Sequence, residues 1–389
     1  MYRAGATAAS AAPRGGTVKR QPTMIRGRER QEPDADAMKL LLANPRGFCA
    51  GVYMAIDVVD QLLEICRNKD IYVYHEIVHN KHVVDRFRRR GVKFVDDLSD
   101  VPEGAIVVFS AHGVSPAIRQ FAARRRFKTI DATCPLVTKV HAEAVRYARK
   151  GYQILLIGHT DHQEVVGTRG EAPEAIQVVE STAAIARLKI EDPSKLVYLT
   201  QTTLSMKDAS EIISALKKAF PRIKDPPSED ICYATTNRQS AVRAIAPDCD
   251  LVLVVGSKNS SNSRRLTEIA EASGAPARLI DDKGEVQPQW FRGVETVLIT
   301  AGASAPEDLV RDLILHLLEA YGGEVEQRDI HHEAVEFGLP GTLKDFMRHQ
   351  GVDPTGRRIV MDNAASVDLW LRERAIPHRT INLTVGQTG

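Results

Sequence analysis

Short apolar runs alternate with longer amphipathic stretches between about residue 38 and residue 321. The apolar runs are typical of buried strands, and the stretches between them place apolar residues at helical spacing. In the first such stretch, Val52, Ala55 and Val59 fall on one face of a helix. Because strands that alternate with helices form parallel sheets covered by helices, the pattern predicts an α/β protein.

The individual elements follow from the same pattern, and proline near the expected start of several helices supports their N-terminal ends. The expected strands are 39–43, 71–74, 105–109, 128–130, 153–157, 196–200, 251–255 and 296–300. The expected helices include 51–67, 116–127, 136–150, 204–220, 263–273 and 306–321. After about residue 331 the rhythm is lost, and short helices are expected only at 342–349 and 366–374.

The repeated strand and helix units predict three α/β lobes of similar size. We place lobe 1 at 51–133, lobe 2 at 134–230 and lobe 3 at 231–321. Residues 38–50 are expected to pack at the centre, where the lobes meet.

The two ends of the chain differ from this middle part. Residues 1–37 are rich in Ala, Arg, Gly and Pro, and acidic residues appear only from Glu29 onward. Transit peptides share this composition, but we expect a disordered extension, with Met38 as an alternative start. Residues 322–389 form a C-terminal extension to which the sequence assigns no chemistry.

The overall composition excludes several classes of protein. Hydrophobic residues make up 43% and charged residues 26%, as in soluble globular proteins, and the net charge is +2. Nothing in this charge favours a nucleic acid or a membrane as partner, and no apolar run is long enough to span a bilayer. The odd number of cysteines, five, argues against a disulfide scaffold and favours reduced thiols, so we expect a cytoplasmic protein.

Three cysteines occupy related positions at the expected starts of helices. Cys49, Cys134 and Cys232 each follow a strand-like run and precede a helical pattern, where backbone N–H groups stabilise a thiolate. One thiol from each third of the chain suggests a shared metal centre. Three ligands on a four-iron cluster would leave one iron open for substrate. The absence of CxxC pairs counts against structural zinc. Cys66, on the apolar face of a helix, is expected to be a core thiol, and Cys249 is not expected to bind metal.

Polar residues gather in the loops that follow the strands, where ligands bind in open parallel sheets. The loop GSKNSSNS brings Ser260, Ser261 and Asn262 to the start of a helix, a suitable cradle for phosphate oxygens. The alternative is a cluster of helix-capping residues. Ser304 and histidines on matching loops favour the phosphate site. A bound diphosphate would favour protonated imidazoles.

A second loop, GHTDHQEVVG, contains the candidate proton donor. Glu164 is its only carboxylate beside two histidines, and nearby phosphate would raise its pKa as a donor requires. The alternative is a solvated loop acid. We prefer His162 to His159 as a ligand-binding residue because it lies nearer to Glu164.

Eight segments together resemble the family of 4-hydroxy-3-methylbut-2-enyl diphosphate reductases, from the last step of the non-mevalonate isoprenoid pathway. The resemblance covers about residues 38–321. The segments are NPRGFCAGV, HNKHVVDRF, SAHGVSP, DATCPLVTKVH, TQTTLS, DICYATTNRQ, VVGSKNSSNS and TAGASAP. One departure is local: where the family commonly has HPEVEG, this chain has HQEVVG at residues 162–167.

The resemblance implies three lobes in a pseudo-threefold arrangement around a central 4Fe–4S cluster. It implies that the cluster ligands are Cys49, Cys134 and Cys232, and that the catalytic residues are Glu164 and Thr202. It implies substrate binding by His79, His112 and His162, and by the diphosphate-binding residues Ser260, Ser261, Asn262 and Ser304.

The implied reaction is the two-electron reductive removal of an allylic hydroxyl from (E)-4-hydroxy-3-methylbut-2-enyl diphosphate. The hydroxyl would bind the iron that lacks a protein ligand. Glu164, with Thr202 and the diphosphate, would deliver protons so that the hydroxyl leaves as water. The products would be isopentenyl and dimethylallyl diphosphates. An external one-electron donor such as ferredoxin or flavodoxin is the implied partner.

Three other functions would have different requirements. An iron–sulfur sensor would need the cysteines but not Glu164 with a phosphate cradle. A zinc hydrolase would be colourless and stable in air, whereas the reductase would be brown and oxygen-sensitive. A dinucleotide-dependent dehydrogenase is disfavoured because no GxGxxG follows a strand.

Overall fold

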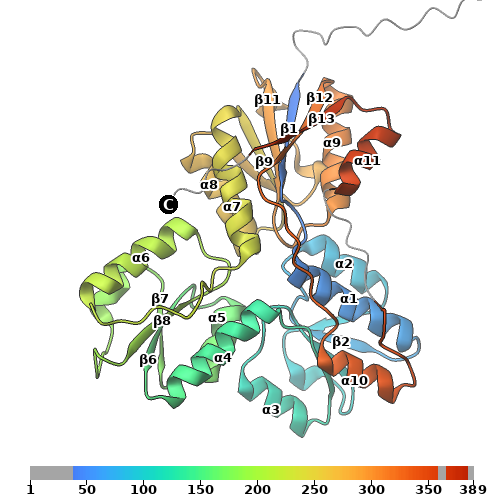
Figure 1. Ribbon diagram of the computed structural model, residues 1–389. Coiled ribbons are helices and arrows are strands. Elements are labelled where there is room, and N and C mark those ends of the chain that lie inside the picture. The colour runs from blue at the N-terminus through green and yellow to red at the C-terminus, as the bar shows by residue number, and fades with distance from the viewer. Residues whose placement is uncertain (1–37, 358–364, 384–389) are drawn as a thin grey trace, which may run out of the picture. The chain divides into compact units, whose positions relative to one another are not determined.

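The computed structural model describes residues 38–357 and 365–383, so the extension expected at 1–37 lies outside the described residues. It contains three separate sheets in which all strands run parallel (Figure 1). The prediction of an α/β protein with parallel sheets is therefore confirmed. The boundaries given above for the lobes stay a prediction. No helix of the described residues has the length and apolar character needed to cross a membrane.

The largest sheet combines segments that are far apart in the sequence. Its strand order is β10 (Ala277–Ile280), β9 (Leu251–Val255), β11 (Thr296–Ala301), β1 (Lys39–Asn44), β12 (Glu324–Asp329) and β13 (His378–Asn382). Its helices are α7 (Tyr233–Ile245), α8 (Ser261–Ala272), α9 (Glu307–Tyr321) and α11 (Ala365–Glu373).

Alternate residues of β1 explain why this strand is apolar throughout. Leu40 and Leu42 pack with residues of α9 and α11, while Leu41 packs with residues of α7 and α8 on the other face. All three leucines are fully buried. A parallel strand covered on both faces must be apolar on both, which is the pattern read from the sequence.

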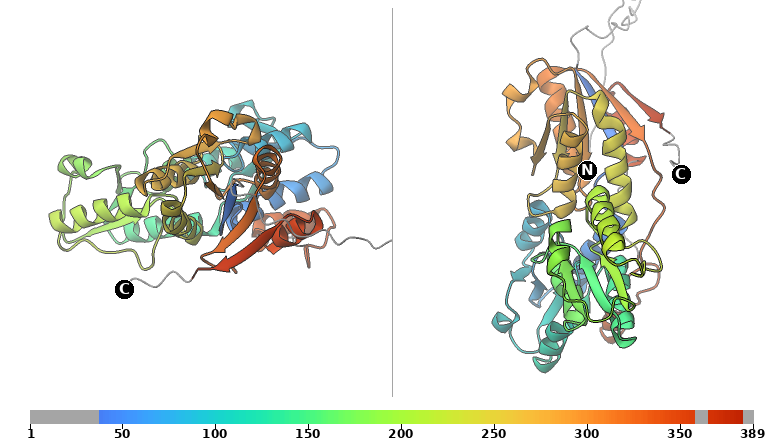
Figure 2. Two further views of the ribbon diagram at one scale, coloured as in Figure 1. Left: turned by 90° about the horizontal axis from the view of Figure 1, so that it is seen from above. Right: turned by 90° about the vertical axis from the view of Figure 1, so that its left-hand side faces the viewer.

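The other two sheets each come from one continuous stretch. The four-stranded sheet has the order β3 (Lys93–Val95), β2 (Ile71–Tyr74), β4 (Ile106–Phe109) and β5 (Lys128–Asp131), with α1 (Ala50–Ile65), α2 (Lys81–Arg89), α3 (Pro116–Arg124) and α10 (Gly341–His349). The three-stranded sheet has the order β7 (Ile176–Val179), β6 (Gln153–Ile157) and β8 (Leu196–Thr200), with α4 (Pro135–Arg149), α5 (Gln163–Glu171) and α6 (Met206–Ala219). Figure 2 shows these elements in two further views.

The C-terminal segment contributes more to the fold than the sequence predicted. The two expected helices are present as α10 and α11, but β12 and β13 were missed. Glu326 of β12 is buried and accepts hydrogen bonds from Arg328 at 2.8 Å and Arg379 at 2.7 Å, with Lys39 at 3.0 Å. Ion pairs take the place of apolar contacts here, so this strand lacks the hydrophobic pattern of its neighbours.

Candidate functional site

Three thiols stand at the N-terminal ends of three helices. Cys49, Cys134 and Cys232 directly precede α1, α4 and α7. In Figure 1 the first turns of these helices lie near the middle of the described part of the chain. The Thr235 N–H donates to the sulfur of Cys232 at 3.4 Å. This is the setting that the sequence predicted, in which helix N–H groups favour sulfur carrying negative charge.

Gly51 shows how closely two of these thiols approach. A Cβ atom at this position would lie 2.6 Å from Sγ of Cys134 and 3.9 Å from Sγ of Cys49. The two sulfur atoms therefore flank one point that only glycine leaves open. All three cysteines line the same pocket. Across residues 38–357 and 365–383, however, no three His, Cys, Asp or Glu side chains converge closely enough to hold a single metal ion.

Burial of the three thiols disfavours their charged thiolate form. Burial raises the pKa of Cys49 and Cys134, and it raises the pKa of Cys232 to about 11. The thiols therefore keep their protons in the metal-free protein at neutral pH. Binding a metal group would release these protons, so its affinity would increase with pH.

The pocket brings together all the residues that the sequence singled out, from all three sheets and their helices. They are Cys49, His79, His112, Cys134, His162, Glu164, Thr202, Cys232, Ser260, Ser261, Asn262 and Ser304. Their convergence agrees with the expectation that loops at the carboxyl ends of parallel strands form one site.

The three histidines form a compact group. The rings of His79 and His112 are stacked with centroids 3.9 Å apart, and His162 meets His79 edge-on at 5.5 Å. Nδ1 of His162 accepts the Glu164 N–H at 3.2 Å, so in the neutral ring the proton sits on Nε2. Nδ1 of His79 lies 3.2 Å from the carboxylate of Glu76, to which it can donate.

Burial, with a smaller contribution from neighbouring histidines, lowers the pKa of His112 and lowers the pKa of His162 to about 3. In the protein alone these rings are neutral. The negative charge of a bound diphosphate would oppose this shift and favour the protonated rings that the sequence predicts for the liganded site.

Glu164 is held by the backbone and side chain of one residue. Its carboxylate accepts the Thr202 N–H at 2.7 Å and the Thr202 hydroxyl at 2.9 Å, and the residue is 2% exposed. Burial raises the pKa of Glu164 to about 7, even though the hydrogen bonds from Thr202 lower it. The sequence predicted a raised pKa from a nearby bound phosphate, and that effect stays a prediction; in the protein alone the cause of the raised pKa is burial. This carboxyl can carry a proton near neutral pH.

The serine and asparagine loop serves in part as a helix cap. The hydroxyl of Ser260 accepts the Ser263 N–H at 3.3 Å at the start of α8, as the capping alternative expected. Capping does not account for Asn262, which is 4% exposed. Its amide oxygen and nitrogen are buried and have no hydrogen-bond partner within the described residues. A buried amide of this kind is suited to a polar ligand.

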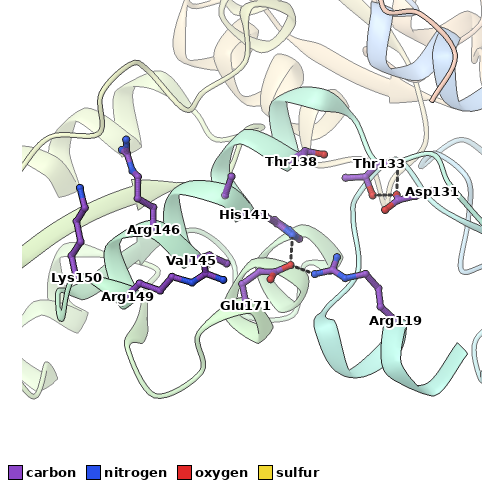
Figure 3. Close-up of a pocket in the computed structure, with 11 residues that line it drawn as sticks. Arg119, Asp131, Thr133, Thr138, His141, Val145, Arg146, Arg149, Lys150 and Glu171 are labelled. Carbon is purple, nitrogen blue, oxygen red and sulfur yellow. Dashed lines mark hydrogen bonds and ion pairs between the residues drawn. The ribbon is translucent and has the colours of Figure 1, made fainter. Parts of the chain in front are cut away.

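A second groove lies on the outer side of α4 and includes none of the predicted residues (Figure 3). Glu171 forms an ion pair there with Arg119, and its carboxylate also lies 3.0 Å from Nδ1 of His141. These contacts join α3, α4 and α5.

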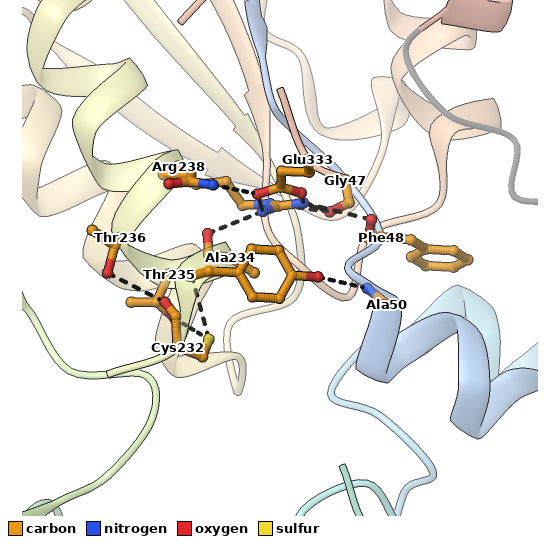
Figure 4. A network of polar contacts seen from close by, with 11 residues as sticks. Gly47, Phe48, Ala50, Cys232, Ala234, Thr235, Thr236, Arg238 and Glu333 are labelled. Carbon is orange, nitrogen blue, oxygen red and sulfur yellow. Dashed lines mark hydrogen bonds and ion pairs between the residues drawn. The ribbon is translucent and has the colours of Figure 1, made fainter. Parts of the chain in front are cut away.

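Arg238 and Glu333 form a largely buried ion pair that the sequence pattern does not predict (Figure 4). Arg238 is fully buried and donates to the carbonyls of Gly47 at 2.8 Å and Ala234 at 3.0 Å. It also pairs with Glu333 at 2.9 Å. The network therefore ties the segment before Cys49 to the helix that follows Cys232.

Lys139 of α4 makes a comparable connection. Its ammonium group donates to the carbonyls of Ser228 at 3.0 Å and Glu229 at 2.8 Å, and to the Asp230 carboxylate at 3.0 Å. This ties the helix after Cys134 to the segment before Cys232. We call the Arg238 and Lys139 connections the two clasps.

Replacing Arg238 with methionine is expected to lower the free energy of unfolding by about 3–5 kcal/mol, because a fully buried cation is removed and Glu333, whose side chain is only 16% exposed, loses its ion pair. Equilibrium urea denaturation of the metal-free protein measures this change. Arg243→Met on the exposed side of the same helix is the matched control, with an expected change within about 0.5 kcal/mol. Equal stability of the two variants would show that the clasp contributes nothing.

Comparison with known proteins identifies similar chains. The model of a family described as LytB protein matches residues 40–318. The 4-hydroxy-3-methylbut-2-enyl diphosphate reductase of Nocardia farcinica is 55% identical over 317 residues, which are 81% of this chain and 94% of the relative. The relative of the same name from Rhodopirellula baltica is 52% identical, with 80% of this chain and 98% of the relative covered.

The fold is also similar to a solved structure, the E-1-hydroxy-2-methyl-but-2-enyl-4-diphosphate reductase of Plasmodium falciparum. The TM-score is 0.78 at 38% identity, and the match covers 81% of this chain and 99% of that one.

Proposed function

This chain belongs to the LytB protein family, and on that premise we propose that it reduces (E)-4-hydroxy-3-methylbut-2-enyl diphosphate to isopentenyl and dimethylallyl diphosphates. The reaction takes up two electrons and two protons and releases water. The observation that carries the proposal is the pocket in which three thiols, three histidines, a buried acid and the serine and asparagine loop meet. The five cysteines are free thiols, which fits a reducing compartment such as the cytoplasm.

We propose that Cys49, Cys134 and Cys232 hold a 4Fe–4S cluster. Three thiols that share a pocket without converging on one point suit a cluster better than a single zinc ion. Gly51 has no Cβ that would clash with Sγ of Cys134, so this sulfur can lie close to the start of α1, near Cys49. When bound, such a cluster supplies electrons singly and a Lewis-acidic iron for the hydroxyl oxygen.

The histidines and the serine and asparagine loop are proposed to bind the diphosphate. Asn262 offers a buried amide with no partner within the part of the chain described, and Nε2 of His162 carries a proton that it can donate. Ser260 and the first turn of α8 add donors at a helix N-terminus, where phosphate binds well. Together these groups would fix the allylic end of the substrate toward the thiols.

Glu164 is proposed to supply a proton to the departing hydroxyl. Thr202 holds its carboxyl through two hydrogen bonds, and burial keeps it protonated to higher pH than an exposed acid. Water is a far better leaving group than hydroxide, so the acid lowers the barrier to breaking the carbon–oxygen bond.

Anaerobic assay tests the function directly. The holoenzyme, with reduced methyl viologen as electron source, is expected to convert the substrate into both diphosphate products, which chromatography with mass detection would quantify. A colourless protein that contains zinc and hydrolyses the diphosphate would contradict the proposal.

The pH dependence of kcat/KM follows from the raised pKa of Glu164. The proton donor is present below about pH 7 and is lost as pH rises through that value, so kcat/KM is expected to fall on the alkaline side. Methyl viologen is a suitable reductant because its one-electron couple involves no proton. A kcat/KM that stays constant into mildly alkaline pH would contradict the assignment.

A further inference from the structure

The exposed side of α4 begins directly beside a proposed cluster ligand. Pro135, Thr138 and Ala142 are exposed along this side, and Pro135 follows Cys134 in the chain. Their side chains are small, so another molecule can approach the first turn of the helix closely. Cys134 itself is partly exposed.

The two sides of this first turn face different spaces. Leu136 and Val137 line the substrate pocket together with Cys134, whereas Thr133 and Thr138 line the groove on the outer side of α4. A molecule seated in the groove therefore reaches the Cys134 end of the helix without entering the substrate pocket.

Basic side chains surround the far part of the groove. Arg146, Arg149 and Lys150 are exposed at the C-terminal end of α4, and Arg119 of α3 lies across from them with 39% of its side chain exposed (Figure 3). The basic groove is defined by these four residues together with Thr133, Thr138 and Ala142.

Acidic side chains in the basic groove do not cancel this charge. Glu171 has 8% of its side chain exposed and is already paired with Arg119 and His141. Asp131 accepts the Thr133 N–H at 3.0 Å. Since Arg146, Arg149 and Lys150 remain exposed, the groove presents a net positive field to an approaching protein.

We propose that the basic groove is the docking site of an acidic one-electron carrier protein. This inference rests on the proposed function, which needs two electrons that arrive singly. Each carrier molecule would be oxidised by one electron, and two successive encounters would supply the pair that the reaction consumes. The cations would steer and hold the carrier, while the small side chains near Cys134 would keep the transfer distance short.

Surfaces beside the other two cysteines are less suitable. The residues next to Cys49 include Phe48, which packs edge-on against Tyr53 at 5.2 Å and is not fully exposed. Before Cys232 the exposed side chains include that of Glu229, which would repel an acidic partner. Among these three approaches, only the one along α4 combines small side chains with an excess of cations.

The test reverses two charges at the far end of the groove. The Arg146→Glu and Arg149→Glu double variant of the holoenzyme is assayed with reduced plant-type ferredoxin and, in parallel, with reduced methyl viologen. With ferredoxin at low ionic strength, kcat/KM is expected to fall about tenfold or more. With methyl viologen it is expected to stay unchanged. Added salt should narrow the difference between variant and parent, because it screens the attraction in the parent.

Lys207→Glu with Lys218→Glu is the matched control. Both lysines are exposed on α6, which covers the other face of the three-stranded sheet from α4, and the change in charge is the same. This variant should behave as the parent with both donors. Equal losses in the control and in the groove variant would overturn the proposal, as would a groove variant that ferredoxin reduces normally or one that loses activity with both donors.

A binding measurement tests the docking site independently of the proposed reaction. Oxidised ferredoxin is titrated calorimetrically into the parent and into both double variants at low ionic strength. Weaker binding by the groove variant alone supports the docking site even if no substrate is turned over, an outcome that would contradict the proposed function instead. Equal binding by all three proteins would overturn the docking site whatever the activity.

Discussion

Glu164→Gln is expected to lower kcat by a factor of about 10²–10⁴, the usual contribution of a positioned general acid. Glutamine has nearly the same shape and its carbonyl oxygen can still accept the Thr202 N–H, which now meets the carboxylate at 2.7 Å. What the variant loses is an acidic proton near the reacting centre. Anaerobic turnover with reduced methyl viologen measures the loss.

The same preparation should keep its metal centre and its substrate. Visible absorption and iron content are expected to match those of the parent, and so is the affinity for substrate. Glu174→Gln, at an exposed position just after α5, is the control and should retain full activity. Near-normal turnover of Glu164→Gln would remove this residue from the proposed role.

Cys134→Ser is expected to abolish activity and the visible absorption of the cluster under anaerobic conditions. A serine hydroxyl is a poor substitute for a soft thiolate toward iron, and Sγ of Cys134 is one of the two sulfur atoms beside Gly51. Iron content per chain and the absorption spectrum of the anaerobically isolated protein measure the effect.

Cys249→Ser provides the matched control for this change. Cys249 lies between the end of α7 and the start of β9, and its thiol donates to the Ile245 carbonyl at 3.3 Å, a contact that serine can reproduce. This variant should keep the absorption and the iron of the parent. An intact cluster in Cys134→Ser would move the ligand assignment to another residue.

The sequence predicted the bounds of several buried strands, and the residues that it singled out share one pocket, for a common reason. β2, β6, β8 and β9 have the bounds that were expected, because strands covered on both faces are apolar throughout. Site residues lie where such strands end, and distinctive motifs mark them. Parallel topology places these loops at one edge of each sheet, and the edges of all three sheets contribute to one pocket.

Elements whose stability comes from charges or from partial burial were harder to predict. The short strands β3, β7 and β10 lie at sheet edges, and β12 buries Glu326 among cations. The helix α2 has only Val83, Val84 and Phe87 buried, and four arginine or lysine residues outnumber them. Segments with so few buried apolar residues cannot be predicted from hydrophobic periodicity.

The two clasps were missed for a related reason. Arg238 and Lys139 each lie within a helical pattern, where a single basic residue is usually solvated. Their partners are mainly backbone carbonyls and acids that are distant in the sequence, and Glu333 falls in the tail to which no chemistry was assigned. Only the folded chain shows that these cations join the segments that carry the cysteines.

The position of Glu333 has a consequence for biogenesis. Residues 39–44 have strand neighbours at 296–301 and 324–329, and Arg238 finds its carboxylate only at residue 333. A nascent polypeptide leaving the ribosome therefore contains all three cysteines proposed to bind the cluster long before the contacts around Cys49 can form. Insertion of the proposed cluster is therefore expected only after synthesis is nearly complete, as a post-translational event.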